Sequence, residues 1–131
     1  MNLLLDTQAL IWWREGSRKL GARARKAIET NAATVQVSVA TAWEVAIKFR
    51  SERLTLPAAP YVWLPAALDS SGFGTLMVTI DHALAVANLP DHHRDPFDRM
   101  LIVQAQLEDL TVVTSDEAFE DYDVKLLDAR T

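Results

Sequence analysis

The sequence predicts an α/β protein with a three-layer α/β/α architecture, in which a mostly parallel sheet of about five strands lies between layers of helices. Two observations predict this class. Short, continuous apolar runs rich in branched side chains are typical of strands buried on both faces. These runs alternate along the chain with segments that have helical apolar spacing, and such alternation favours right-handed crossovers and parallel strands.

The strands are predicted from four clear apolar runs and a weaker fifth. In chain order they cover residues 2–5, 35–37, 76–79, 111–113 and 124–126. Gly72, Phe73 and Gly74 are predicted to form a turn into the third strand. A phosphate-binding loop is excluded, because the Lys and Ser/Thr that end such a loop do not follow them.

Helices are predicted between the strands, over residues 20–31, 39–50, 60–70, 82–88 and 96–109. The last of these has the clearest start, because Asp95 can cap it and Pro96 takes the first helical position. Open sheets with such crossovers bind ligands beyond the carboxyl ends of their strands. The residues that directly follow each strand are therefore the candidates for a functional site.

The length and composition are those of a small globular protein. The chain has 131 residues, a formal net charge of −5 and no cysteine. We expect a single domain spanning 1–131. Disulfides, thiolate catalysis and cysteine-bound zinc are excluded. The apolar runs are too short for a membrane span or a signal peptide, so we expect a cytoplasmic protein without membrane contact.

The charge is unevenly distributed. Residues 1–60 carry nine basic and five acidic side chains, whereas residues 61–131 carry four basic and thirteen acidic ones. Six basic residues lie between positions 14 and 26: Arg14, Arg18, Lys19, Arg23, Arg25 and Lys26. This cluster is typical either of a solvated helix face or of a surface that contacts phosphate groups beside an acidic centre.

Four acidic residues occupy the positions where a site is expected. Asp6 follows the first strand, Glu44 lies near the start of the helix after the second strand, Asp98 lies in the first turn of the last helix, and Asp116 follows the fourth strand. Each has a local alternative, as a helix cap, a favourable charge at a helix N-terminus or a partner of a nearby lysine.

Taken together, the four carboxylates indicate a metal site. Gathered carboxylates repel one another and raise each other's pKa unless a cation neutralises them. A cluster of carboxylates without cysteine and without a well-placed histidine favours a hard ion such as Mg²⁺ or Mn²⁺. Such an ion can lower the pKa of a bound water and stabilise charge on a phosphoryl group, so the pattern indicates phosphodiester hydrolysis.

At these residues the chain resembles PIN-domain ribonucleases, and specifically the VapC-type toxins of type II toxin–antitoxin pairs. The resemblance covers nearly the whole chain. Its strongest segments are LLLDTQALIWW (3–13), SVATAWEVAIK (38–48), LP (89–90) with HRDPFDRMLI (93–102), and VTSD (113–116). Their order and spacing together are specific to this family. One departure is minor, since Gln8 stands where close relatives often have His.

The resemblance implies a set of site residues. Asp6, Glu44, Asp98 and Asp116 match the acidic quartet of the family, with Asp6 and Asp98 as the firmest metal ligands and the other two acting directly or through water. Thr114 matches a small hydroxyl residue beside the fourth acid.

Arg99 is a supporting candidate, and two roles are open for it. The side chain could contact phosphate or the leaving group, or it could pair with Asp95 one helical turn earlier.

The resemblance also implies an activity and partners. Family members cleave RNA internally with Mg²⁺ or Mn²⁺, leaving a 5′-phosphate and a 3′-hydroxyl. They usually form homodimers, and a VapB-type antitoxin wraps them, in some cases as a hetero-oligomer, and blocks the site. Ile11, Trp12, Trp13 and Trp63 are candidates for an apolar groove that receives the antitoxin, with burial in the core as the alternative.

The sequence leaves three other interpretations less favoured. His92 and His93 could bind a transition metal or act as acid and base without metal, but adjacent histidines before a helix cap are typically solvated. A phosphoacceptor receiver would use Asp6, Asp81 and Lys125, and would leave the other acids without a role. A catalytically silent PIN-fold binding module would not need all four acids.

Overall fold

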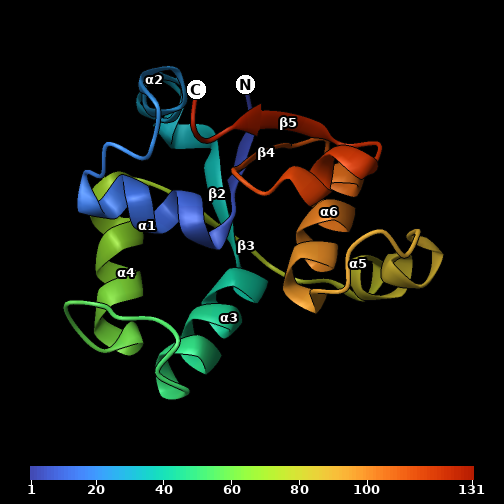
Figure 1. Ribbon diagram of the computed structural model, residues 1–131, viewed down its shortest axis with the longest axis horizontal. Helices are drawn as coiled ribbons and strands as arrows, with labels where there is room; N and C mark the ends of the chain where they lie inside the picture. Colours follow the sequence, from blue (N-terminus) through green and yellow to red (C-terminus); the bar gives the residue numbers. More distant parts are fainter.

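The computed structural model describes all 131 residues and contains a five-stranded sheet. The strands are β1 (Leu3–Leu5), β2 (Val35–Ser38), β3 (Gly74–Leu76), β4 (Thr111–Thr114) and β5 (Lys125–Asp128). They lie in the order β3-β2-β1-β4-β5, and every neighbouring pair is parallel (Figure 1). The predicted α/β class is confirmed.

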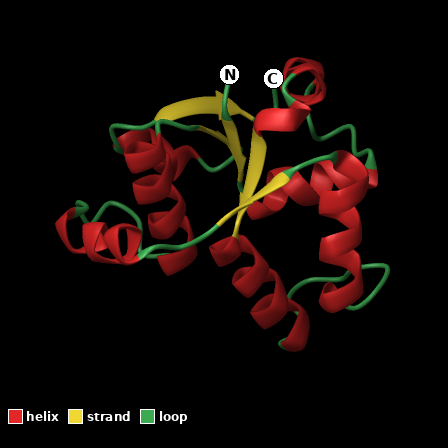
Figure 2. Cartoon of the chain, turned by 180° about the vertical axis from the view of Figure 1, so that it is seen from behind, coloured by secondary structure: helices red, strands yellow, loops and turns green.

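Six α-helices cover the sheet from both sides (Figure 2). They are α1 (Thr7–Glu15), α2 (Ala22–Thr30), α3 (Val39–Arg50), α4 (Pro60–Ser71), α5 (Ile80–Ala85) and α6 (Pro96–Glu108). Short 3-10 turns at Ala32–Thr34, Val86–Asn88 and Glu117–Asp121 complete the connections. No helix has the length and apolarity that crossing a bilayer requires.

The core consists of two hydrophobic clusters, one on each face of the sheet. Successive side chains of β1 point to opposite faces, so Leu3 and Leu5 pack with α1, α2 and α4, whereas Leu4 packs with α6. All three leucines of β1 are fully buried. This continuous burial on two faces explains why an uninterrupted apolar run forms the central strand.

The register of the sheet brings two of the predicted site segments together. Leu5 of β1 lies beside Val113 of β4, and the backbone N–H of Asp6 donates to the carbonyl oxygen of Val113 over 3.1 Å. Asp6 and Thr114 therefore leave the sheet next to each other. Because β2 is parallel to β1 on the other side, α3 begins at the same edge.

The largest differences from the sequence-based prediction are one additional helix and two shifted strands. The sequence predicts no helix over Thr7–Glu15, although Asp6 can cap a helix after β1. The third strand is Gly74–Leu76 rather than 76–79, because Thr79 forms a capping box with His82 and begins α5 earlier than predicted. The fifth strand runs Lys125–Asp128 rather than 124–126.

Helix α6 offers a matched test of the core. Leu101 is fully buried against β4, whereas Leu107 on the same helix is 54% exposed. We expect Leu101→Ala to lower the free energy of unfolding by about 2–5 kcal/mol, because it removes buried methyl groups and leaves a cavity. Leu107→Ala is the control and should change it little. Urea unfolding measures both, and equal losses would contradict this description of the core.

Candidate functional site

Asp6 is held at the start of α1 by a hydrogen bond within its own segment. Its Oδ1 accepts the backbone N–H of Ala9 over 2.8 Å, which makes Asp6 the N-cap of the helix. Burial raises the pKa of Asp6 from 3.8 to about 6. Hydrogen bonds from Thr114 and Ala9 oppose this rise, whereas the charges of Glu44 and Asp116 add to it. Asp6 is therefore a desolvated acid beside two others.

Asp98 lies in the first turn of α6. Its backbone N–H donates to Oδ1 of Asp95, the N-cap of the helix, over 3.1 Å. Burial and the charges of Asp95, Glu44 and Asp6 raise the pKa of Asp98 from 3.8 to about 7, whereas His93 opposes the rise. Asp98 lines the same cleft as these three acids.

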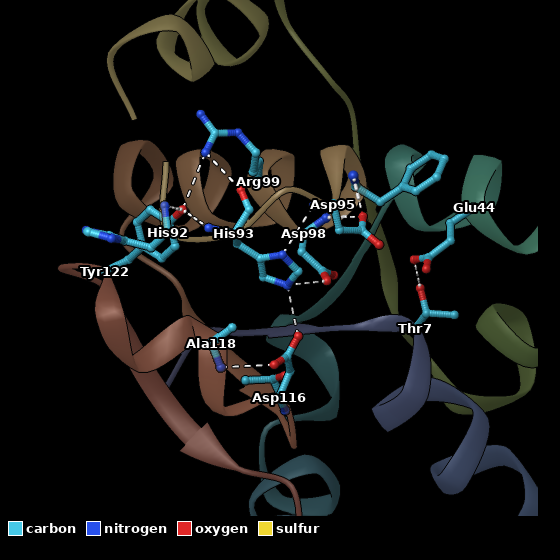
Figure 3. Close-up of polar contacts among 12 residues, drawn as sticks. Thr7, Glu44, His92, His93, Asp95, Asp98, Arg99, Asp116, Ala118 and Tyr122 are labelled. Carbon is cyan, nitrogen blue, oxygen red and sulfur yellow. Dashed lines mark hydrogen bonds and ion pairs between the residues drawn. The ribbon is translucent and has the colours of Figure 1, made fainter. Parts of the chain in front are cut away.

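Glu44 projects from α3 and is buried. Its Oε1 accepts the hydroxyl of Thr7 over 2.5 Å (Figure 3). Its Oε2 forms an ion pair with Lys48 one turn later. The predicted pairing with Lys48 is present, but it does not remove Glu44 from the other acids. The bond to Thr7 fixes the side chain against the start of α1.

Asp116 follows β4 and caps the short turn Glu117–Asp121. Its Oδ1 accepts the backbone N–H of Ala118 over 2.9 Å, and its own N–H donates to Oγ1 of Thr114 over 3.0 Å. Thr114 is buried, and its hydroxyl group hydrogen-bonds to the side chain of Asp6 and to the backbone of Asp116. The Asp116 side chain is 41% exposed, whereas that of Asp98 is 17% exposed, so Asp116 is the more accessible of the two acids.

The four acids line one cleft of about 300 Å³ at the carboxyl edge of the sheet. Asp95, Lys48 and Arg53 also line it. None of the six basic residues between positions 14 and 26 does, so the structure does not place that cluster in the acidic cleft. The cations nearest the acids come from α3 and the turn that follows it.

His93 belongs to the same site, which the sequence-based reasoning missed. Its Nε2 lies 3.0 Å from Oδ2 of Asp98 and 2.9 Å from Oδ2 of Asp116 (Figure 3). His92 is exposed, and its ring contacts Tyr122 edge-on at 5.2 Å instead. The position of His93 two residues before the cap of α6 was the available signal, but spacing alone does not separate it from its neighbour.

Arg99 is engaged with the backbone of the segment before α6. Its guanidinium donates to the carbonyl oxygens of Val86, Leu89, Pro90 and His93 over 2.9–3.3 Å. It also lies 3.6 Å from Asp91, whereas no ion pair with Asp95 forms. In the structure Arg99 holds this segment against α6.

The four candidates for an apolar groove pack against the core. Ile11 and Trp63 are buried, as the alternative of core burial predicts, although Ile11 also lines the acidic cleft, and Trp12 and Trp13 are half-buried against the same core. Trp43, by contrast, is 64% exposed and contacts Phe97 edge-on at 5.4 Å. These two rings line a largely apolar groove of about 550 Å³ formed by α3, α5 and α6 and the segments that precede the last two.

The residues of the receiver interpretation are not brought together with these acids. Asp81 is exposed on α5, and Lys125 is paired with Asp109 over 2.6 Å. Neither lines the cleft that contains Asp6.

The donor set fits a hard divalent cation. Carboxylate oxygens converge from the N-cap of α1, from α3 and α6, and from the segment after β4. The raised pKa values of Asp6 and Asp98 express the cost of holding these negative charges close together and away from water. A cation in the cleft would offset that cost.

Comparison with known proteins identifies the fold. The family model of the PIN domain matches residues 3–125. Similar structures include VapBC2 from Rickettsia felis bound to a promoter DNA fragment (TM-score 0.72, 14% identity, 97% of this chain and 98% of that chain). DNA-bound VapBC from Salmonella typhimurium has a TM-score of 0.72 and 20% identity, covering 98% of each chain. FitAcB from Neisseria gonorrhoeae has a TM-score of 0.68 and 21% identity, covering 97% of each chain. No curated protein matches the chain significantly.

The raised pKa values predict how stability depends on pH without metal. The folded-state values of about 6 and 7 for Asp6 and Asp98 exceed the usual 3.8. Over this interval the folded state binds more protons at these groups than the unfolded chain, so they lower the free energy of unfolding as pH rises.

We therefore expect Asp98→Asn to become increasingly more stable than the wild type as pH rises from about 4 to about 7 in EDTA, because the variant has no charge to bury at that position. Thermal melting at a series of pH values measures this difference. A difference in melting temperature between the variant and the wild type that stays constant over this pH range would contradict the raised pKa of Asp98.

Proposed function

This chain belongs to the PIN-domain family, and we propose that it is a cytoplasmic, metal-dependent endoribonuclease that acts as the toxin of a VapBC-type toxin–antitoxin pair. PIN domains are generally nucleases, and the structural neighbours named above are toxin–antitoxin complexes. The observation that carries the proposal is the convergence of Asp6, Glu44, Asp98 and Asp116 on one cleft.

In this proposal the four acids hold Mg²⁺ or Mn²⁺. Asp6 and Asp98 are the main ligands, and Glu44 and Asp116 act directly or through water. When bound, the ion lowers the pKa of a water molecule and stabilises negative charge on the phosphate. Hydrolysis of the RNA phosphodiester would leave a 5′-phosphate and a 3′-hydroxyl.

Two basic side chains of the cleft are suited to hold the RNA backbone. Lys48 and Arg53 line the cleft beside the acids. Lys48 is paired with Glu44, whereas the exposed guanidinium of Arg53 donates to Oγ of Ser51 over 2.8 Å. Phosphate groups favour such cations at the edge of an acidic site. The net negative charge of the chain is therefore compatible with an RNA substrate.

We also propose two protein partners, a VapB-type antitoxin and a second copy of this chain. The structural neighbours were solved as toxin–antitoxin complexes, which supports the first. The exposed groove around Trp43 and Phe97 supports the second, since Ile80 and Leu84 of α5 add further exposed apolar area near it.

The nuclease proposal is tested by incubating total cellular RNA with the purified protein and Mg²⁺ or Mn²⁺. We expect cleavage that EDTA abolishes and that Asp6→Ala lowers by at least about 100-fold, because a metal ligand is lost. Asp123→Asn, which removes an exposed acid outside the cleft, is the matched control and should cleave like the wild type. Activity that survives both EDTA and Asp6→Ala would rule out the metal-carboxylate mechanism.

The homodimer proposal is tested at Trp43. We expect Trp43→Glu to weaken self-association by at least about 30-fold, because it places a charge in a buried apolar contact. Analytical ultracentrifugation measures the dissociation constant. Leu107→Glu changes an exposed leucine outside the groove and serves as the control. Dimers of unchanged strength in the Trp43 variant would assign the interface to another face.

A further inference from the structure

We propose that His93 is a positioning residue that donates its Nε2–H to Asp116 and lies against Asp98, and that only oxygen atoms coordinate the metal at this site. This inference rests on the proposed metal-dependent function. The three side chains offer one nitrogen and two oxygens within 4.8 Å of one another, which at first resembles a His–Asp–Asp metal site. The hydrogen bonds around the imidazole lead to a different assignment.

The tautomer of His93 follows from its second nitrogen. The backbone N–H of Asp95 donates to Nδ1 of His93 over 3.2 Å, so Nδ1 acts as an acceptor. In a neutral imidazole the proton then resides on Nε2. A nitrogen that carries a proton donates hydrogen bonds and has no lone pair for a metal. Its acceptor is Oδ2 of Asp116 at 2.9 Å, and Oδ2 of Asp98 lies 3.0 Å from the same nitrogen.

Hydrogen bonds to the backbone around His93 keep its ring between Asp98 and Asp116. The hydroxyl oxygen of Tyr122 accepts the backbone N–H groups of His92 and His93 over 3.0 and 2.8 Å, and the hydroxyl donates to the carbonyl oxygen of Pro90 over 2.7 Å. Arg99 donates to the carbonyl oxygen of His93 over 3.2 Å. The His93 ring also contacts Phe119 edge-on at 6.1 Å.

The consequence for the site is a fixed spacing between two acids from different elements. Asp98 belongs to α6, whereas Asp116 follows β4, and the imidazole of His93 stands between them, bonded to Oδ2 of Asp116 and 3.0 Å from Oδ2 of Asp98. Oδ1 of Asp116 accepts a hydrogen bond from the backbone N–H of Ala118. Oδ1 of Asp98 has no hydrogen-bond donor and remains available to a cation. Sites with only oxygen ligands favour Mg²⁺ and Mn²⁺, whereas an imidazole ligand favours zinc, nickel or copper.

The tautomer can be measured directly by ¹⁵N NMR of the imidazole nitrogens in the Mg²⁺-loaded protein. The chain has three histidines, which His92→Ala and His93→Gln assign. We expect His93 to show a protonated Nε2 and an acceptor Nδ1. His82 is an internal reference, because its Nδ1 accepts the backbone N–H of Thr79 over 3.0 Å. A proton on Nδ1 of His93, with Nε2 bound to metal, overturns the inference.

Binding of Mn²⁺, followed by electron paramagnetic resonance without RNA, tests the positioning role. We expect His93→Ala to weaken Mn²⁺ binding about tenfold, because a group that orients ligands is lost. His93→Gln retains an N–H donor and should recover part of the affinity. His92→Ala is the matched control and should bind like the wild type. Unchanged affinity in His93→Ala, or ¹⁴N coupling from His93 to Mn²⁺ in the wild type, overturns the inference.

The two proposals fail in distinguishable ways. A wild type that binds Mn²⁺, has the expected tautomer and loses affinity in His93→Ala, but does not cleave RNA, removes the proposed function and keeps the role of His93. A wild type that cleaves RNA with Mg²⁺ while His93→Ala binds Mn²⁺ unchanged removes the role of His93 alone. A wild type that binds no Mn²⁺ overturns both.

Discussion

The mutual repulsion of four carboxylates in one partly buried cleft shapes the packing of the helices around the site. Asp6 and Asp98 have raised pKa values because burial and neighbouring charges disfavour their ionised forms. The fold opposes this repulsion by giving individual acids a local partner. Backbone N–H groups hold Asp6 and Asp116, Thr7 and Lys48 hold Glu44, and His93 lies beside Asp98 and Asp116.

The same repulsion requires that α3, α5 and α6 keep a fixed relation to one another. A buried polar chain connects them. Ser38, the N-cap of α3, donates to Oε1 of Gln104 on α6 over 2.6 Å, and Gln104 Nε2 lies 3.3 Å from Nδ1 of the buried His82 on α5. His82 in turn lies 3.0 Å from Glu108. Hydrogen bonds have directions that apolar contacts lack, so this chain fixes Glu44 of α3 relative to Asp98 of α6.

The sequence was sufficient for the α/β class and for the edge of the sheet where the acids lie, because both follow from strand periodicity and from parallel crossovers. It failed where tertiary contacts decide. Trp63 and Trp43 both lie on predicted helices, and only the packing of α4 and α3 determines that the first is buried and the second exposed. His93 and His92 are adjacent in one loop, and only Tyr122 and Asp95 determine which ring faces the acids.

Asp6 and Asp116 each use one carboxylate oxygen to cap a turn of backbone. Asparagine caps a helix as well as aspartate does, since its amide oxygen accepts the same N–H groups. An Asp-to-Asn change at either position removes the negative charge that would hold a cation while keeping the cap. A single Asp-to-Asn change at Asp6 would therefore remove a charge that a cation needs while the start of α1 keeps its cap, so the site can lose its charge without loss of the fold.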